Sequence, residues 1–93
     1  GIAERILTSG ERALPVQSQA ARFAAKEALA KALGSPGGMS WLDVEVVRSE
    51  AGVPSFVVTG TVAERVAELG VTRIHLSVSH DGGFATATVV CEA

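Results

Sequence analysis

Four charged side chains lie within one alanine-rich segment and could do chemistry as a group. Residues 22–34 (RFAAKEALAKALG) carry Arg22, Lys26, Glu27 and Lys31. A carboxylate can bind a hard cation such as Mg²⁺, and cations beside it can neutralise phosphate oxygens. One carboxylate does not hold Mg²⁺ firmly, so a further carboxylate or a substrate phosphate has to complete the site. The segment is therefore a candidate metal and phosphate site, with Glu27 as the metal ligand.

The same spacing is also typical of an ordinary surface helix. Glu27 precedes Lys31 by four residues, an order that stabilises a helix by roughly 0.2–0.5 kcal/mol. On a helix of 3.6 residues per turn, Lys26 falls within an apolar stripe, along which its stem can pack while its ammonium reaches water. That stripe consists of Phe23, Leu29, Ala30 and Leu33. The pattern alone leaves both interpretations open.

A second group of polar residues precedes a glycine turn. Ser77, Ser79 and His80 come at the end of an alternating segment, and residues 80–83 (HDGG) form the turn. Strand ends beside such turns expose side chains and backbone N–H groups to ligands, so Ser79 and His80 are candidate phosphate contacts. The alternative is a plain hairpin turn with a solvated histidine. Ser77 and His80 do not indicate a serine nucleophile, because no G-x-S-x-G segment surrounds them.

The charged segment belongs to a predicted helix over residues 19–33. Ser18 is a suitable N-cap, and Gly34 suits the left-handed position after the last turn. Residues 2–8 can form one or two helical turns, and we expect residues 9–15 to be a loop.

Alternating apolar residues predict two hairpins. The first pairs residues 42–48 with 55–59, and the second pairs 73–79, with Ile74, Leu76 and Val78 facing inward, with 84–90. Between the hairpins, Thr61 and Glu64 have the spacing of a capping box for a helix over residues 62–69. The expected fold class is α+β, an antiparallel sheet packed against helices.

Composition narrows the class of protein. The chain has 93 residues, 47% of them hydrophobic, which suits one small globular domain. Its net charge of −2 argues against a nucleic-acid partner, and no apolar run is long enough to span a bilayer. The single cysteine, Cys91, cannot form an internal disulfide, which fits a cytoplasmic location.

The ordered motifs resemble those of the holo-acyl-carrier-protein synthase family, whose members are 4′-phosphopantetheinyl transferases. In that family a helix carries a bulky aromatic residue, two small residues and Lys-Glu-Ala, with a further lysine after them. Phe23 to Lys31 fit this motif. Further segments follow in the family's order: WLDVEV at 41–46, GVP at 52–54, HLSVSHD at 75–81 and ATATVVCEA at 85–93.

The resemblance implies an activity and a set of roles. The family moves the phosphopantetheine arm of coenzyme A to a serine of an acyl carrier protein, releases 3′,5′-ADP and needs Mg²⁺. Glu27 would bind Mg²⁺ and act with Lys31 in catalysis. Lys31 and Lys26 would lie near the diphosphate, and Arg22 and His80 would contact phosphates of coenzyme A. Small members of the family are homotrimers with active sites at the subunit interfaces.

One departure from the family pattern is visible. The family opens with a Gly-Ile-Asp strand whose aspartate is a second Mg²⁺ ligand, whereas this sequence begins at Gly1, in what would be the following helix. We therefore expect a single domain over residues 1–93 without its N-terminal strand, and two interpretations stay open: the strand precedes the given sequence, or the protein lacks it. The alternative to an enzyme is a carrier-protein-binding or oligomerising domain that has lost the metal aspartate.

Overall fold

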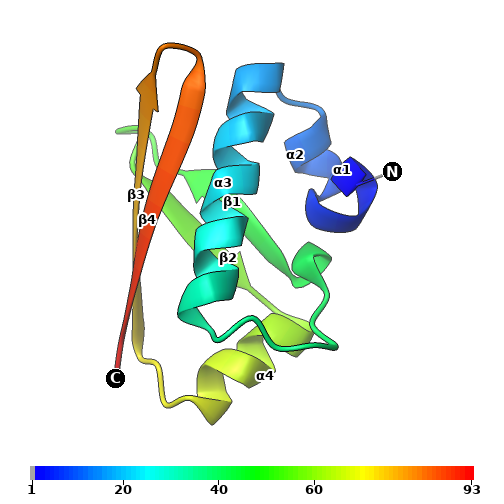
Figure 1. The fold of residues 1–93 in the computed structure, drawn as a ribbon, viewed down its shortest axis with the longest axis vertical. Coiled ribbons are helices and arrows are strands. Elements are labelled where there is room, and N and C mark those ends of the chain that lie inside the picture. The colour runs from blue at the N-terminus through cyan, green and yellow to red at the C-terminus, as the bar shows by residue number, and fades with distance from the viewer. Residues whose placement is uncertain (1) are drawn as a thin grey trace.

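A computed structural model describes residues 2–93 and shows two β-hairpins and four α-helices (Figure 1). The helices and strands, with one short 3-10 helix (η1), are α1 Ile2–Ile6, α2 Ser9–Arg12, α3 Val16–Ala32, η1 Trp41–Asp43, β1 Val44–Arg48, β2 Pro54–Val58, α4 Gly60–Glu68, β3 Arg73–Asp81 and β4 Phe84–Glu92. Within residues 2–93, none of the helices combines the length and apolar composition needed to cross a membrane.

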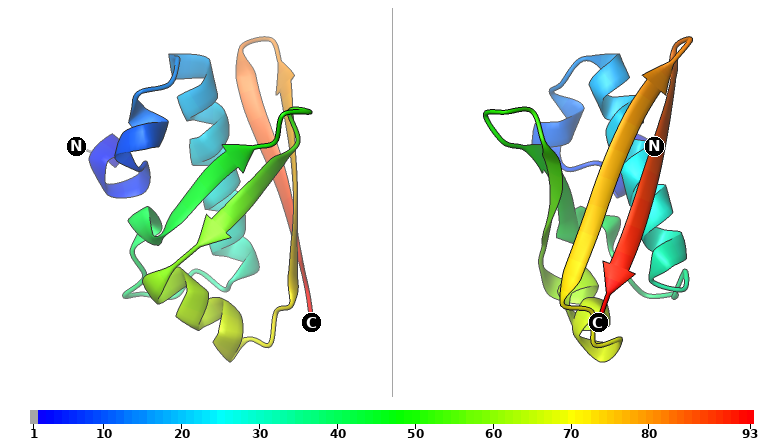
Figure 2. Two further views of the ribbon diagram at one scale, coloured as in Figure 1. Left: turned by 180° about the vertical axis from the view of Figure 1, so that it is seen from behind. Right: turned by 90° about the vertical axis from the view of Figure 1, so that its left-hand side faces the viewer.

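The long helix α3 lies lengthwise beside the β3–β4 hairpin, as the views in Figures 1 and 2 show. Both hairpins are antiparallel, and β2 lies against β3. Short helices α1 and α2 lie on the other side of α3 from the β3–β4 hairpin. The predicted α+β class, an antiparallel sheet packed against helices, is confirmed.

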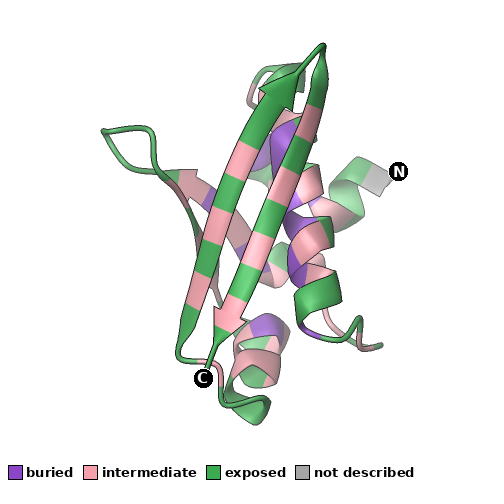
Figure 3. Ribbon diagram, turned by 60° about the vertical axis from the view of Figure 1, so that its left-hand side comes forward, coloured by how far each residue is buried: buried purple, intermediate pink, exposed green. Residues whose placement is uncertain are grey.

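The core lies where α3, α4 and the first hairpin meet. Its fully buried members are Leu29, Leu33, Val44 and Val62. Along β3 and β4, partly buried residues alternate with exposed ones, which Figure 3 shows as bands. Ile74, Leu76 and Val78 take the inner positions, as their alternation predicted.

Helix α3 differs from its prediction at its start and in its buried face. It begins at Val16, with Pro15 rather than Ser18 as the N-cap. At the other end Gly34 has a φ of +83°, the predicted left-handed position. Phe23 is 39% exposed, and the buried side of the helix instead includes Lys26. Helical angles cannot show which polar side chain has a buried partner elsewhere in the chain.

Residues 9–12 are helical, so the predicted loop over 9–15 is wrong there. Thr8 and Glu11 form a capping box: the Thr8 hydroxyl accepts from the Glu11 backbone N–H at 3.2 Å, and Glu11 Oε1 accepts from the Thr8 backbone N–H at 2.9 Å. Such reciprocal bonds stabilise the first turn of a helix.

The predicted capping box of Thr61 and Glu64 is also wrong. Helix α4 begins at Gly60 with Thr59 as its N-cap. The Thr61 backbone N–H and hydroxyl both donate to Asp43 Oδ2, at 2.8 and 2.7 Å. A carboxylate from η1 therefore caps this helix, and it also suits the positive end of the helix dipole.

Candidate active site between helix α3 and the β3–β4 hairpin

An open groove of about 590 Å³ runs between α3 and β4. Glu27 and Lys31 line it from the helix, and Thr86 and Thr88 line it from the strand. The other residues that line it are apolar: Ala24, Ala28 and Ala32 on the helix, and Ala87 and Val89 on the strand. Because alanine side chains end at Cβ, the helix leaves space beside the strand for a ligand.

The two charged groups of this groove face solvent. Lys31 Nζ lies 4.0 Å from Glu27 Oε1, and the side chains are 75% and 60% exposed. A loose, exposed pair of this kind contributes little to stability. Both groups are therefore free to bind charged atoms of a ligand.

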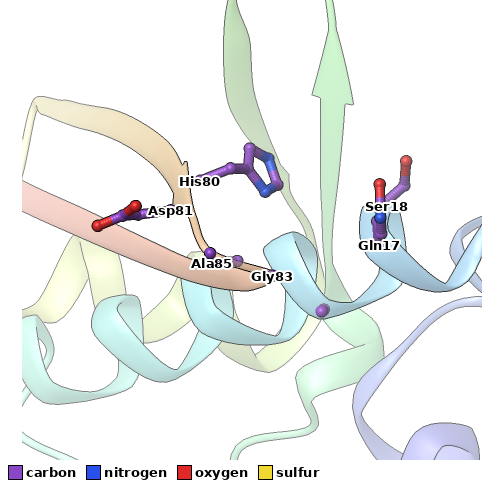
Figure 4. A pocket seen from close by; sticks show the side chains of 8 residues that line it. Gln17, Ser18, His80, Asp81, Gly83 and Ala85 are labelled. Atoms are coloured by element: carbon purple, nitrogen blue, oxygen red, sulfur yellow. The ribbon is translucent and has the colours of Figure 1, made fainter.

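A second hollow, of about 300 Å³, lies between the start of α3 and the tip of the hairpin (Figure 4). Gln17 and Ser18 line it from the helix, and residues 80–83 line it from the turn. His80 points toward the first turn of α3, whereas Asp81 points away. The N-cap residue, Pro15, makes no side-chain hydrogen bond to this helix, so the first backbone N–H groups of α3 are available as donors at its positive end. This end of the site suits an anion.

The hollow and the groove form one trough along α3. Ala20 and Ala85 line both the hollow and an intermediate stretch, which shares Ala24 and Glu27 with the groove. From Gln17 to Lys31 the helix rises about 21 Å at 1.5 Å per residue. The trough can therefore hold an extended ligand with negative charges at two separated points.

Lys26, a predicted phosphate contact, instead faces the interior. Its side chain is 1% exposed, and Nζ donates to Glu11 Oε1 at 2.6 Å, to the Ile6 carbonyl at 2.7 Å and to the Trp41 carbonyl at 3.0 Å. These three bonds use all three ammonium donors. Burial lowers the pKa of Lys26, while the hydrogen bond and charge of Glu11 oppose that shift. The position therefore gives no support to a phosphate contact.

Arg22 is also turned inward and is 7% exposed. Its Nη1 donates to the Ser18 carbonyl at 3.2 Å, and within the described part of the chain its Nε has no hydrogen-bond partner.

Ser79 and His75 lie on the exposed face of the second hairpin. The Ser79 hydroxyl is 3.0 Å from the hydroxyl of Thr86, its partner on β4. Thr86 lines the groove, whereas Ser79 lies behind it on the neighbouring strand. His75 contacts Glu92 across the two strands.

Comparisons with known proteins identify the family. The sequence profile of the 4′-phosphopantetheinyl transferase superfamily matches residues 1–89. The chain belongs to this superfamily. The holo-[acyl-carrier-protein] synthase of Clavibacter michiganensis is 64% identical over 92 residues, which are 99% of this chain and 77% of that protein. The resemblance stated from the motifs, and the enzyme class that it implied, are confirmed.

Solved structures of the same family share the fold. A crystal structure of the holo-[acyl-carrier-protein] synthase of Neisseria meningitidis has a TM-score of 0.86 at 35% identity, covering 99% of this chain and 80% of that one. The Helicobacter pylori enzyme in complex with coenzyme A has a TM-score of 0.81 at 33% identity, covering 98% and 81%.

The donor set of this transferase suits Mg²⁺ only in part. Among residues 2–93, no group of three or more His, Cys, Asp or Glu side chains is placed to hold a metal ion. Glu27 offers one exposed carboxylate beside a groove. Mg²⁺ commonly takes one or two carboxylates and fills its remaining positions with phosphate oxygens and water. Glu27 therefore fits as a ligand for a metal that arrives with a phosphorylated substrate.

Sequence reasoning missed several residues that line the trough of this transferase, and one buried residue behind it. Thr86 and Thr88 hold alternate, outward positions of β4, so the period-two pattern could have marked them as exposed neighbours of the groove. Gln17 had no such signal, because the predicted helix began after it. Glu11 could have been found, because Thr8 and Glu11 have the same T-x-x-E spacing that predicted a capping box at Thr61 and Glu64.

Proposed function

We propose that this transferase moves the 4′-phosphopantetheine arm of coenzyme A to a serine of an apo acyl carrier protein, with Mg²⁺, and releases 3′,5′-ADP. The observation that carries the proposal is the trough along α3, with Glu27 and Lys31 in its groove and His80 beside a helix N-terminus at its far end. Support also comes from the relatives named for this activity and from the relative in complex with coenzyme A.

The trough suits coenzyme A because that molecule carries phosphates at separate positions. Lys31 is proposed to neutralise the diphosphate, next to the bond that breaks. His80 and the first backbone N–H groups of α3 are proposed to contact another phosphate of the same molecule. Ser79 is proposed to support this set indirectly, because its hydroxyl contacts that of Thr86, which lines the groove. Phosphoryl-type transfer needs positioning and charge neutralisation more than covalent help, and these groups supply both.

Glu27 is proposed to have two functions. Its carboxylate would hold Mg²⁺ together with phosphate oxygens of coenzyme A, and the bound ion would stabilise negative charge on the departing 3′,5′-ADP. Among the described residues that line the groove, Glu27 is the only carboxylate, so it is also the candidate to accept the proton of the carrier-protein serine.

Arg22 and Lys26, the other two predicted phosphate contacts, differ in the support that each has. Arg22 stays a prediction, supported by a buried Nε that lacks a partner in the described chain. We leave Lys26 out of the phosphate-binding set, because three protein oxygens already bind its ammonium.

We further propose a homotrimer in the cytoplasm, with each site completed at a subunit interface. Strand β4, which lines the trough, pairs with β3 alone within residues 2–93 and so has a free edge. Large apolar side chains are exposed at the hairpin and at the start of α3: Val16, Phe84 and Val90. A partner subunit could cover these surfaces.

The direct test is to incubate the chain with coenzyme A, Mg²⁺ and apo acyl carrier protein, and to weigh the carrier protein by mass spectrometry. We expect addition of the phosphopantetheine arm with Mg²⁺ and none with EDTA. Glu27→Gln is expected to abolish the transfer while preserving the circular dichroism spectrum, since its side chain lies outside the core. Glu64→Gln on α4 is the control and keeps full activity. Transfer at a normal rate by Glu27→Gln would refute the role of Glu27.

A further inference from the structure

Glu11 lies at the centre of a buried set of hydrogen bonds that the proposed chemistry does not use. It is 1% exposed, although its carboxylate is ionisable. Oε1 accepts from Lys26 Nζ at 2.6 Å and from the Thr8 backbone N–H at 2.9 Å, and Oε2 accepts from the Val46 backbone N–H at 2.8 Å. Both carboxylate oxygens are thus bound from three different parts of the chain.

Stability alone does not explain this buried ion pair. Moving a carboxylate and an ammonium out of water costs several kcal/mol per ion, and well-packed apolar residues of similar size often serve equally well. What the pair adds is a fixed orientation of α3 relative to its neighbours. The Lys26 ammonium binds Glu11, the Ile6 carbonyl and the Trp41 carbonyl, so its helix is fixed to α1, α2 and η1 at one point.

That point is one residue from Glu27. On a helix, neighbouring side chains differ by 100° around the axis, so a side chain held in the interior fixes where the next one projects. With Lys26 bound inside, Glu27 faces the groove beside Lys31. A rotation or slide of α3 would move the Glu27 carboxylate away from a substrate bound against β4, and a displacement of about 1 Å can cost a hundredfold in rate.

We infer that Glu11 and Lys26 are positioning residues, which set the orientation of α3 and so hold the Glu27 carboxylate in place for metal and substrate. This inference rests on the proposed role of Glu27. It assigns Lys26 a function in the interior in place of the phosphate contact that the sequence suggested.

The test replaces the pair with apolar residues of similar size, Glu11→Leu with Lys26→Met, so that no charge is left buried alone. Three quantities are compared with the unaltered protein: the urea unfolding midpoint, kcat and KM for coenzyme A, and the affinity for Mn²⁺ in the presence of coenzyme A, read by electron paramagnetic resonance. We expect a nearly unchanged midpoint, a kcat at least tenfold lower with little change in KM, and a similar loss of Mn²⁺ affinity.

Combining these substitutions with Glu27→Gln separates positioning from general damage. If the pair acts through Glu27, removing it from the Glu27→Gln protein causes little further loss of Mn²⁺ affinity. Additive losses would overturn the inference, as would a double variant with the original kcat and Mn²⁺ affinity. An active Glu27→Gln single variant would instead refute the proposed function.

If the double variant does not fold, Glu11→Gln provides the same comparison. Its amide oxygen can still accept from Lys26, but its amide nitrogen cannot accept from the Val46 N–H. We expect an intermediate loss of kcat and Mn²⁺ affinity, again absent when Glu27 is already glutamine, and unchanged values for both would overturn the inference.

Discussion

Two lysines on one helix show how position decides what a side chain does. Lys26 and Lys31 both belong to the charged motif, yet one is 1% exposed and the other 75% exposed. The interior lysine has three protein acceptors, and the groove lysine has one loose partner at 4.0 Å. The first therefore contributes to the position of α3, whereas the second is available to substrate.

The same substitution should lower stability at one position and leave it nearly unchanged at the other. Lys26→Met leaves the Glu11 carboxylate buried without its cation, which we expect to lower the free energy of unfolding by about 3–5 kcal/mol. Lys31→Met should change it by less than about 0.5 kcal/mol but lower kcat/KM about a hundredfold, because it removes the cation that we propose neutralises the reacting phosphates. Urea unfolding and steady-state kinetics measure the two effects, and a stability loss confined to Lys31→Met would contradict this account.

At the scale of single elements, the contact between η1 and the start of α4 should make the stability of the protein depend on pH. Hydrogen bonds from the Thr61 hydroxyl and backbone N–H lower the pKa of Asp43. The unfolded chain then takes up a proton near pH 4, where the folded chain still holds the anion. The stability contributed by Asp43 is therefore present above about pH 4 and is lost as the pH falls through the folded-state pKa.

Asp43→Asn should remove this dependence. We expect the variant to have a lower urea midpoint than the unaltered protein at pH 7 and a smaller difference at pH 3. Glu64→Gln, on an exposed position of the same helix, is the control and should show no such change. An equal difference at both pH values would show that the Asp43 charge does not stabilise the start of α4.

Individual elements were predictable where their signals were local. Alternation of Ile74, Leu76 and Val78 predicted an inner strand face, and Gly34 marked the end of α3. The errors arose where a distant residue decides the outcome. Asp43 caps α4 from eighteen residues away, so the local Thr61–Glu64 spacing misled. The α2 helix was missed because its capping box, Thr8 and Glu11, lies in a short polar segment without regularly spaced apolar residues.

At the scale of the whole molecule, the site residues come from two separated parts of the chain. The Lys-Glu-Ala motif placed Glu27 and Lys31 on one helix, but no periodicity shows that this helix packs along β4. Nor could spacing show that Lys26 reaches Glu11, fifteen residues earlier. The family resemblance gave the expected activity, whereas the interior role of Lys26 came from the structure.

A homotrimer is the prediction that belongs to the whole molecule. Native mass spectrometry at micromolar concentration should show three copies, because we propose that neighbouring subunits cover the edge of β4 and the apolar side chains near the trough. Phe84→Asp, at a side chain that is 77% exposed, is expected to weaken assembly without altering the fold. A fully active monomer would contradict the proposal that each site is completed at an interface.

The most direct test of the central claim is a crystal structure with coenzyme A and Mn²⁺, in which anomalous scattering locates the metal. The account predicts a metal bound directly to the Glu27 carboxylate and to the diphosphate, with the Lys31 ammonium on the same phosphates. A nucleotide bound elsewhere, with Glu27 facing bulk solvent and far from the metal, would contradict it.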